Sequence, residues 1–550
     1  MAFYKRKPDI IIKNGAIVDG TGAPVYYADI AIIGDKIDYI GDLKAVEAPV
    51  VIDAHHKYVT PGFIDGHSHV DFTLWAAPEA GNHITQGITT AIPGCCGYSM
   101  RHYLNDIPFA PAGDCIKCVY DMNGQKDIPA GAMAATLDKV EAMGTCINTA
   151  WYCGHNDLRV LAGVNTTYPT EEQYTIMEKF LREAMEAGYI GFSTGLEFDP
   201  GVMSKPEEVE RLAAIAAEYD ANYSSHMRDE GTYILEAINE FLNVIRKTGL
   251  RGTVSHLNVK YDNGIPNEYL QKGMQMLKDA RKIEHLNVYA DMLPTCFATG
   301  GGQAVLPAWL YADGIEKVKE ILANPTGREK VKNDMNRYWR FLAAGQWDRL
   351  LSVQTGGYWP EVDHTPFNQL VEKWGKDPAD CYLDIIAAAP SIQALRNVCI
   401  IGNVFHEQTM IDSVVRDPIY LWMTDARAAN ETGDVAKLVN NMQDYMSMTY
   451  FFTRYVRDLG VISIEKAVEK ASGLAAKHYR LEDRGTLEVG KYADINVFDI
   501  NELKINASFT EPCKYCTGMD YVLVNGTPVI EKGEFNGKRA GRVLRHLPKK

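Results

Sequence analysis

The stretch Pro61-Gly-Phe-Ile-Asp-Gly-His-Ser-His69 decides the fold class, because it joins an apolar strand to a pair of histidines. Side chains alternate between the two faces of a strand, so His67 and His69 point the same way. Two imidazoles one strand step apart can chelate a metal ion. The apolar run before them predicts that they follow a buried strand at its carboxyl end, where TIM barrels carry their chemistry. The alternative is an exposed strand that carries two polar residues.

Strand and helix patterns alternate through the middle of the chain. Eight strand candidates lie at residues 63–65, 89–92, 148–151, 190–193, 222–225, 252–255, 287–290 and 419–423. Among the helical segments between them, Thr170 with Gln173 and Ser204 with Glu207 have the spacing of capping boxes. Eight strands that alternate with helices predict an α/β protein with a (β/α)8 TIM-type barrel.

The two chain ends share a different pattern. Short strands separated by turn pairs such as Asn14-Gly15 fill residues 1–58, and the same pattern returns over residues 476–550. Together they predict a small β-sandwich domain formed by both termini, around a barrel domain at residues 59–475. The connection from Asp291 to Asp425 is several times longer than one β/α unit of roughly 30 residues. This excess predicts a lid insertion around residues 296–360.

Composition limits the partners of the protein. The 550 residues carry 56 basic and 71 acidic side chains, a net charge of −15. An acidic balance argues against nucleic acid or an anionic membrane as the main partner. The chain has no run of about 18 apolar residues, and the N-terminal apolar run Ile10–Ile12 is too short for a signal peptide. We therefore expect a cytoplasmic protein with free thiols among its 11 cysteines.

Three further strand ends carry side chains that can bind metal. Gly94-Cys-Cys-Gly97 closes the second strand, His226 the fifth and His256 the sixth. Because one β/α unit separates the two histidines, they are expected at matching levels on adjacent strands. A thiolate and imidazoles are good zinc ligands. The alternative is a packed thiol and two hydrogen-bonded core histidines.

Asp425 ends the eighth strand in Leu421-Trp-Met-Thr-Asp425. An aspartate facing a metal at this position can bind it weakly and take the proton of an attacking water. The alternative is a helix N-cap, a common role for aspartate.

Two C-x-x-C pairs, Cys115-Ile-Lys-Cys118 and Cys513-Lys-Tyr-Cys516, stand outside these strand ends. Together they could form a structural zinc site. They lie far apart in the chain, however, and a single C-x-x-C pair is poor evidence for zinc.

Taken together, these segments resemble the amidohydrolase superfamily, and within it the N-acyl-D-amino-acid deacylase (D-aminoacylase) family. The resemblance covers nearly the whole chain. The matching segments are Ile11–Gly22, Gly87–Thr90, Gly94–Gly97, Gly191–Leu196, Ser225–Glu230, Leu306–Trp309, Tyr455–Arg457 and Asp483–Asp494.

The resemblance implies a zinc-dependent hydrolase of the amide bond of an N-acyl amino acid, in particular an N-acyl-D-amino acid. It implies one or two zinc ions. His67 and His69 would form the weaker site, and Cys96, His226 and His256 the tighter one, with Cys96 able to bridge. Asp425 would be a metal ligand, the general base and then the acid for the leaving amine. The expected partner is this small molecule, with no nucleic acid and no membrane, and an oligomer is possible.

Several positions depart from the family pattern. Cys95 stands where relatives carry Asn, and Met292-Leu293-Pro294-Thr295 replaces a Tyr-Pro-Tyr segment, so the tyrosine that polarises the scissile carbonyl is missing near Leu293. The resemblance thus supports metal-dependent hydrolysis more strongly than it supports specificity for N-acyl-D-amino acids. An amidohydrolase of a cyclic amide or imide is the alternative, followed by a non-catalytic barrel scaffold.

Arg228 is the candidate for substrate binding, because it lies next to the expected ligand His226. Its guanidinium could pair bidentately with a substrate carboxylate. It could equally form an ion pair with Asp229 or Glu230, and the sequence leaves both interpretations open.

Overall fold

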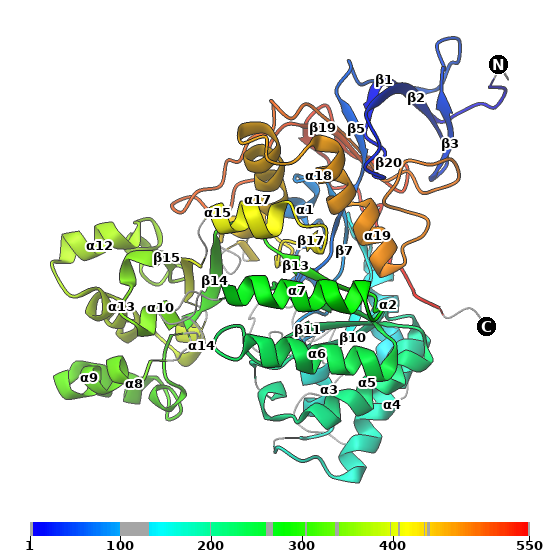
Figure 1. The fold of residues 1–550 in the computed structure, drawn as a ribbon. Helices are drawn as coiled ribbons and strands as arrows, with labels where there is room; N and C mark the ends of the chain where they lie inside the picture. The colour runs from blue at the N-terminus through cyan, green and yellow to red at the C-terminus, as the bar shows by residue number, and fades with distance from the viewer. Residues whose placement is uncertain are drawn as a thin grey trace.

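The computed structural model describes residues 4–99, 131–164, 166–198, 200–259, 268–302, 305–335, 340–396, 398–404, 407–433, 435–436 and 441–547. Figure 1 shows a small β domain near the N-terminus, a body of long helices packed around parallel strands, and a lobe of short helices on the opposite side.

All eight predicted strand segments are present, within a few residues of their expected bounds. They are β6 (Phe63–Asp65), β7 (Ile88–Ala91), β8 (Asn148–Thr149) with β9 (Tyr152–Gly154), β10 (Gly191–Gly195), β11 (Asn222–His226), β12 (Arg251–Val254), β13 (Val288–Met292) and β17 (Tyr420–Trp422).

These strands pair in parallel as two sheets, β6-β7-β8 and β9-β10-β11-β12-β13-β17. β8 and β9 belong to one continuous segment, which joins the sheets on one side. On the other side the Gly66 N–H donates to the Trp422 carbonyl at 3.4 Å, between the ends of β6 and β17. The strands thus surround one core, as the α/β barrel prediction requires.

The helices that follow β9 to β12 cover the outside of these strands (Figure 1). They are α3 (His155–Leu161), α4 (Glu171–Ala187), α5 (Pro206–Glu218), α6 (Ile234–Thr248) and α7 (Glu268–Lys282). The predicted capping box of Thr170 and Gln173 is confirmed at the start of α4. The one predicted at Ser204 is wrong: α5 starts at Pro206, and the Ser204 hydroxyl donates to the Gly201 carbonyl. Proline favours the first helical position, because its φ is fixed and it has no N–H to satisfy there.

A buried ion pair joins α3 to α5. Glu208 accepts hydrogen bonds from Arg159 Nη1 at 2.6 and 2.7 Å and lies 2.8 Å from His155 Nε2, and all three side chains are at most 1% exposed. Removing one partner of a buried pair leaves the other charge uncompensated. We expect Glu208→Gln to lower the free energy of unfolding by about 3–5 kcal/mol, measured by urea denaturation.

Arg182 and Glu218 provide the control for this substitution, since they form an arginine–glutamate pair on the surface, with side chains 41% and 53% exposed. Exposed pairs contribute roughly 0–1 kcal/mol. Glu218→Gln should therefore change stability little, and equal losses in the two variants would contradict the expectation.

A nine-stranded sheet brings the two chain ends together. It contains β1 (Ile10–Ile17), β2 (Tyr26–Ile33), β3 (Lys36–Gly41), β4 (Val50–Asp53), β5 (Tyr58–Pro61), β18 (Ile495–Phe498), β19 (Met519–Val524), β20 (Thr527–Glu531) and β21 (Glu534–Phe535). The junction is the antiparallel pair of β5 and β18. Apolar residues from both ends, among them Ile12, Ile37 and Ile495, share one core.

An insertion follows β13. Its strands β14 (Phe297–Gly301), β15 (Leu350–Gln354) and β16 (Cys399–Asn403) form an antiparallel sheet in the order β14-β16-β15. The lobe in Figure 1 contains α8 (Ile315–Ala323), α9 (Pro325–Asn333), α10 (Arg340–Ala343), α12 (Phe367–Trp374) and α13 (Pro378–Ala387). The insertion continues beyond residue 360, and its role as a lid stays a prediction.

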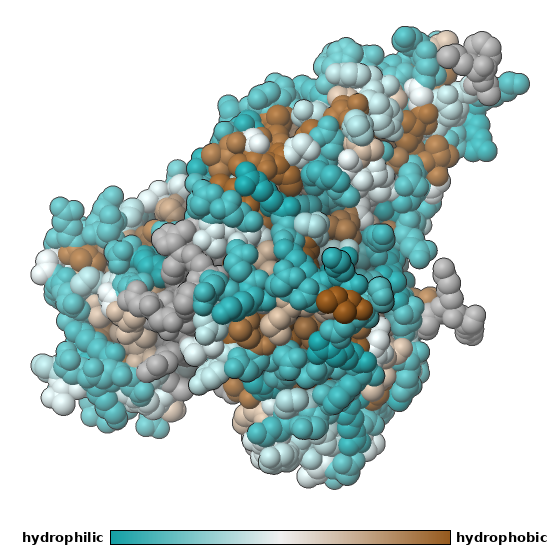
Figure 2. All heavy atoms as spheres, viewed as in Figure 1, coloured by the Kyte–Doolittle hydropathy of each residue, from teal (hydrophilic) through white to brown (hydrophobic). Residues whose placement is uncertain are grey.

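Hydrophilic residues cover most of the face shown in Figure 2, and apolar residues gather in a few separate groups. No helix in the described ranges combines the length and apolar character needed to cross a bilayer.

Candidate metal centre

The six predicted metal-site residues converge at the carboxyl ends of the strands. His67 and His69 follow β6, Cys96 follows β7, His226 ends β11, His256 follows β12 and Asp425 follows β17. The side chains of His67, Cys96, His226 and His256 are almost fully buried, whereas Asp425 is 30% exposed. The barrel therefore brings together residues that lie hundreds of positions apart in the chain.

The thiol of Cys96 lies at the centre of three imidazoles. Its Sγ is 3.2 Å from His67 Nε2, 3.5 Å from His256 Nε2 and 3.9 Å from His226 Nδ1. The last two nitrogens are 2.9 Å apart. One thiol and two imidazole nitrogens that face a common point form a donor set suited to zinc.

A second donor set shares Cys96 with the first. It consists of His67, His69 and Cys96, whose donor atoms all lie within 4.8 Å of one another. Asp425 Oδ1 lies beside it, 3.2 Å from His69 Nε2 and 3.4 Å from His67 Nε2. The cluster therefore offers two adjoining positions for a cation, with the carboxylate next to the second.

Cys95 takes no part in this cluster. It is fully buried, and its thiol donates to the Ile92 carbonyl at 3.4 Å. The adjacent thiols thus face different surroundings, and the left-handed backbone of Cys96, with a φ of 53°, turns its side chain toward the imidazoles.

Carboxylates contact the ring nitrogens that face away from the thiol. Asp291 Oδ2 is 3.3 Å from His67 Nδ1, and Glu230 Oε1 is 2.6 Å from His256 Nδ1. Metal-binding histidines usually donate their second ring N–H to such a partner, which fixes the tautomer and raises ligand basicity.

Glu197 has the same relation to His226, with Oε2 3.0 Å from Nε2. No motif in the sequence marks Glu197, Glu230 or Asp291 for such a role. Two of them could have been found by searching the carboxyl end of every strand for polar residues, because Asp291 lies near the end of β13 and Glu197 two residues beyond β10.

Backbone strain accumulates at the same positions. Cys96, His256 and Asp425 have φ angles of 53°, 32° and 55°, in the left-handed region that non-glycine residues seldom adopt. Each such residue costs on the order of 1–3 kcal/mol, and such residues cluster at functional sites. Gly97 is required beside Cys96, because a Cβ there would lie 2.6 Å from the Gly195 backbone nitrogen.

The charges of the cluster depend on one another. Burial and the negative charge of Asp425 raise the pKa of the Cys96 thiol well above its ordinary value, so a thiolate there requires a cation nearby. Burial alone would also raise the pKa of Asp425, but the hydrogen bond with His69 and the charge of His67 hold it well below its usual range. Burial opposes protonation of His256, yet Glu230 raises the pKa of that imidazole to about 9.

Aromatic side chains pack against two histidines of the cluster. Phe72 stacks on His69 with ring centroids 4.8 Å apart, and Phe198 packs on His226 at 4.4 Å. Apolar walls exclude water and strengthen the electrostatic interactions inside a site.

Arg228 points away from the cluster toward α6. Its Nε and Nη2 donate to the two carboxylate oxygens of Glu240 at 2.9 and 2.8 Å. Its ion-pair partner is therefore Glu240, rather than the neighbouring Asp229 or Glu230. A substrate carboxylate would have to displace Glu240 to bind this guanidinium bidentately.

Of the two C-x-x-C pairs, Cys115 and Cys118 lie outside the described residues. The Cys513 thiol donates to the Ala436 carbonyl and the Cys516 thiol to the Tyr445 carbonyl. These contacts explain the second pair as packed thiols.

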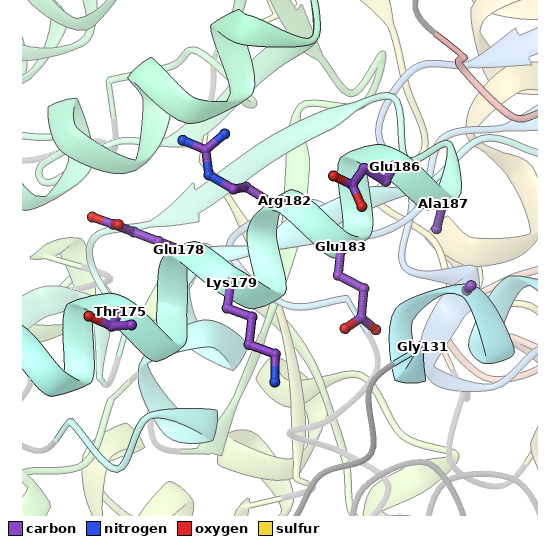
Figure 3. Close-up of a pocket in the computed structure, with 9 residues that line it drawn as sticks. Gly131, Thr175, Glu178, Lys179, Arg182, Glu183, Glu186 and Ala187 are labelled. Carbon is purple, nitrogen blue, oxygen red and sulfur yellow. The ribbon is translucent and has the colours of Figure 1, made fainter.

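A groove of about 740 Å³ lies between α2 (Ala132–Met143) and α4, as Figure 3 shows. Its lining includes Glu178, Lys179, Arg182 and Glu183, and none of the candidate ligands. Several of these charges already have partners within the fold: Arg182 pairs with Glu218, and Glu183 accepts from the Met133 N–H. The groove is thus separate from the metal cluster.

Comparison with known proteins agrees with this geometry. Over 98% of this chain and 97% of the relative, the sequence is 28% identical to an N-acyl-D-glutamate deacylase of Alcaligenes xylosoxydans xylosoxydans. A D-aminoacylase of the same organism is also 28% identical over the same shares.

Solved structures agree as well. The N-acyl-D-glutamate deacylase of Bordetella bronchiseptica, determined with zinc and a phosphonate inhibitor, has a TM-score of 0.74 at 27% identity, over 98% of this chain and all of that one. A D-aminoacylase structure gives 0.74 at 25% identity, over 98% and 99% of the two chains.

The model of the amidohydrolase family matches residues 50–285 and 384–530, which is well over half of the chain. The unmatched middle contains most of the insertion after β13. The chain therefore belongs to the amidohydrolase family, and it is a hydrolase that acts on carbon–nitrogen bonds of non-peptide amides.

Proposed function

We propose that this protein is a zinc-dependent deacylase that hydrolyses the amide bond of an N-acyl-D-amino acid. The observation that carries the proposal is the Cys96 thiol among three imidazoles, with Asp425 beside the same His67 nitrogen that faces the thiol. Similarity over nearly the full length to an N-acyl-D-glutamate deacylase and a D-aminoacylase supports the substrate class.

The donor set fits zinc better than a hard cation. A thiol and four imidazoles suit a borderline-soft metal, whereas magnesium and calcium prefer sites made of oxygen ligands. In the proposed assignment, Cys96, His226 and His256 hold the tighter ion. His67, His69 and Asp425 would hold a weaker second ion, next to the Cys96 thiol.

Bound zinc would supply Lewis acidity to the amide carbonyl and to the attacking water. Asp425 is placed to accept a proton from that water, because it is partly exposed and contacts His67 and His69. The water oxygen bonds to the amide carbon, and the carbon–nitrogen bond breaks. Asp425 passes the proton to the leaving nitrogen, so that a carboxylic acid and an amine result.

Two aromatic side chains limit the access of water to the imidazoles. Phe72 and Phe198 shield the imidazoles from solvent on the sides where they pack. Against the effect of burial, the hydrogen bond with His69 and the charge of His67 keep the pKa of Asp425 low, so it holds a proton only briefly and the leaving nitrogen must lie close to it.

A substrate screen together with metal analysis tests the proposal. The purified protein is incubated with N-acetyl-D-amino acids, their L-enantiomers and a cyclic amide such as hydantoin, and its metal is measured by mass spectrometry. We expect zinc and hydrolysis of the D-enantiomers. Hydrolysis of the cyclic amide alone would support the alternative amidohydrolase reaction, and a zinc-bound protein inactive on every amide would point to a scaffold.

The orienting carboxylates give a separate prediction about metal affinity. Glu230→Gln removes the carboxylate charge that faces His256 Nδ1 at 2.6 Å while it keeps the size of the side chain. Loss of such a partner costs about 10–100-fold in metal affinity. We expect this variant to lose zinc at a correspondingly lower chelator concentration than the wild type.

Glu236→Gln is the matched control, because Glu236 is an exposed carboxylate on α6. It should hold zinc as the wild type does. Unchanged zinc affinity in Glu230→Gln would mean that Glu230 does not orient a ligand.

A further inference from the structure

The position of the leaving group limits where a substrate carboxylate can bind. In an N-acyl amino acid, only the nitrogen and the α-carbon separate the amide carbon from the carboxylate carbon. If Asp425 protonates that nitrogen, the carboxylate must lie on the Asp425 side of the cluster. A cation that binds it should therefore stand near Asp425 and not near the Glu240 pair of Arg228.

Arg427 stands at that place. The backbone that carries it is hydrogen-bonded to the histidine segment: the Asp425 N–H donates to the His67 carbonyl at 3.0 Å, and the His69 N–H donates to the Ala426 carbonyl at 2.8 Å. Arg427 is the next residue, so it lies at the mouth of the barrel beside the second donor set.

The guanidinium of Arg427 is held by a buried carboxylate. Its Nη2 donates to Asp444 Oδ2 at 3.3 Å, and its side chain is 28% exposed. Asp444 is buried in α17 (Met442–Tyr450), where burial raises the pKa of its carboxyl to about 6 and the charge of Arg427 opposes this shift.

The electrostatic neighbours of the two arginines differ. Burial raises the pKa of Cys399 in β16 to about 12, and the nearby charge of Arg427 opposes this shift. Arg228 acts instead on His155 and Tyr223, which are outside the cluster. Arg427 thus lies between the metal-site histidines, α17 and the sheet of the insertion.

We infer that Arg427 is a specificity-determining residue that binds the free α-carboxylate of an N-acyl amino acid. The inference rests on the proposed function, because it takes the direction of the leaving nitrogen from the role of Asp425. Asp444 holds the guanidinium from behind. The expected substrates are therefore N-acyl amino acids with a free carboxylate, and neutral N-acyl compounds should be poor ones.

The test compares an N-acetyl amino acid with the same compound bearing a terminal carboxamide. Release of acetate is measured for both, so that only cleavage of the acyl–nitrogen bond is counted. A hydrogen bond to a charged group contributes about 1.5–3 kcal/mol. Arg427→Gln should therefore lower kcat/KM for the carboxylate about 10- to 100-fold, mainly through KM, and for the carboxamide less than about threefold. Arg427→Lys should recover part of the lost kcat/KM, since lysine keeps the positive charge but not the paired N–H donors of the guanidinium.

Arg228→Gln is the matched comparison, and it should leave the ratio between the two substrates unchanged. Equal losses on both substrates in Arg427→Gln would overturn the inference, as would a loss of discrimination in Arg228→Gln alone. If the wild type cleaves the two compounds equally well, the carboxylate is not recognised and only this inference fails. If the wild type releases acetate from neither, the proposed function fails together with it.

Discussion

The Asp425→Asn protein is expected to keep its fold and its bound metal and to lose nearly all amide hydrolysis. An amide has almost the size of the carboxylate, but it cannot accept the proton of the attacking water. Because one group is proposed to serve both proton transfers, the loss should exceed the roughly 10²–10⁴-fold typical of a single general acid–base step. The measurement is kcat for an N-acetyl amino acid, with zinc content determined on the same sample.

The backbone conformation of Asp425 suits asparagine, so this substitution should change the chemistry of the side chain without disturbing the fold. Asp425 has a φ of 55°, and asparagine adopts this left-handed region more readily than most residues. The fold should therefore tolerate the change, and a circular dichroism melt should show it. Asp313→Asn, which removes an exposed carboxylate from the surface, is the control and should keep full activity. Activity within tenfold of the wild type in Asp425→Asn would remove Asp425 from the mechanism.

The barrel could be predicted from the sequence because its strands have a strong local signal. Apolar runs such as Phe63–Asp65 end in turn or polar residues, and each predicted run is found as a strand. The positions of the candidate ligands then follow from topology alone, since parallel strands in a barrel present their carboxyl ends at one face. His226 and His256 could be placed together without any knowledge of contacts.

Interactions across elements could not be predicted in the same way. Arg228 pairs with Glu240, which lies twelve positions later on α6, whereas the sequence suggests only its neighbours Asp229 and Glu230 as partners. The choice depends on how α6 packs on β11, and periodicity does not contain that information. The same holds for Glu197, whose contact with His226 joins the loop after β10 to the next strand.

The positions that depart from the family pattern show another limit. Leu293 lies where the family resemblance leads one to expect a tyrosine, and it is buried. A leucine at such a site offers packing but no hydrogen bond to a substrate carbonyl. Polarisation of the carbonyl must then depend on the metal or on a residue that the family pattern does not mark, so the sequence supports the reaction class better than the substrate.

The adjacent cysteines allow the metal assignment to be tested by two substitutions of the same kind. Cys96→Ser should lose tight zinc binding, because a hydroxyl near neutral pH is a much poorer zinc ligand than a thiolate. Its zinc affinity should fall by more than about 100-fold, the upper range for loss of a mere orienting partner. Cys95→Ser should keep zinc and most activity, since its side chain donates to the Ile92 carbonyl and a serine hydroxyl can make the same bond.

Zinc content after dialysis against a chelator, followed by activity on an N-acetyl amino acid, separates the two variants. Both changes replace sulfur by oxygen in a buried side chain, so a general effect on stability would affect both proteins alike. A difference between them must come from what each sulfur faces: three imidazole nitrogens within 3.9 Å for Cys96 and a backbone carbonyl for Cys95. If Cys95→Ser lost the metal and Cys96→Ser kept it, the register of the segment after β7 would differ by one residue, and the proposed donor set would be wrong.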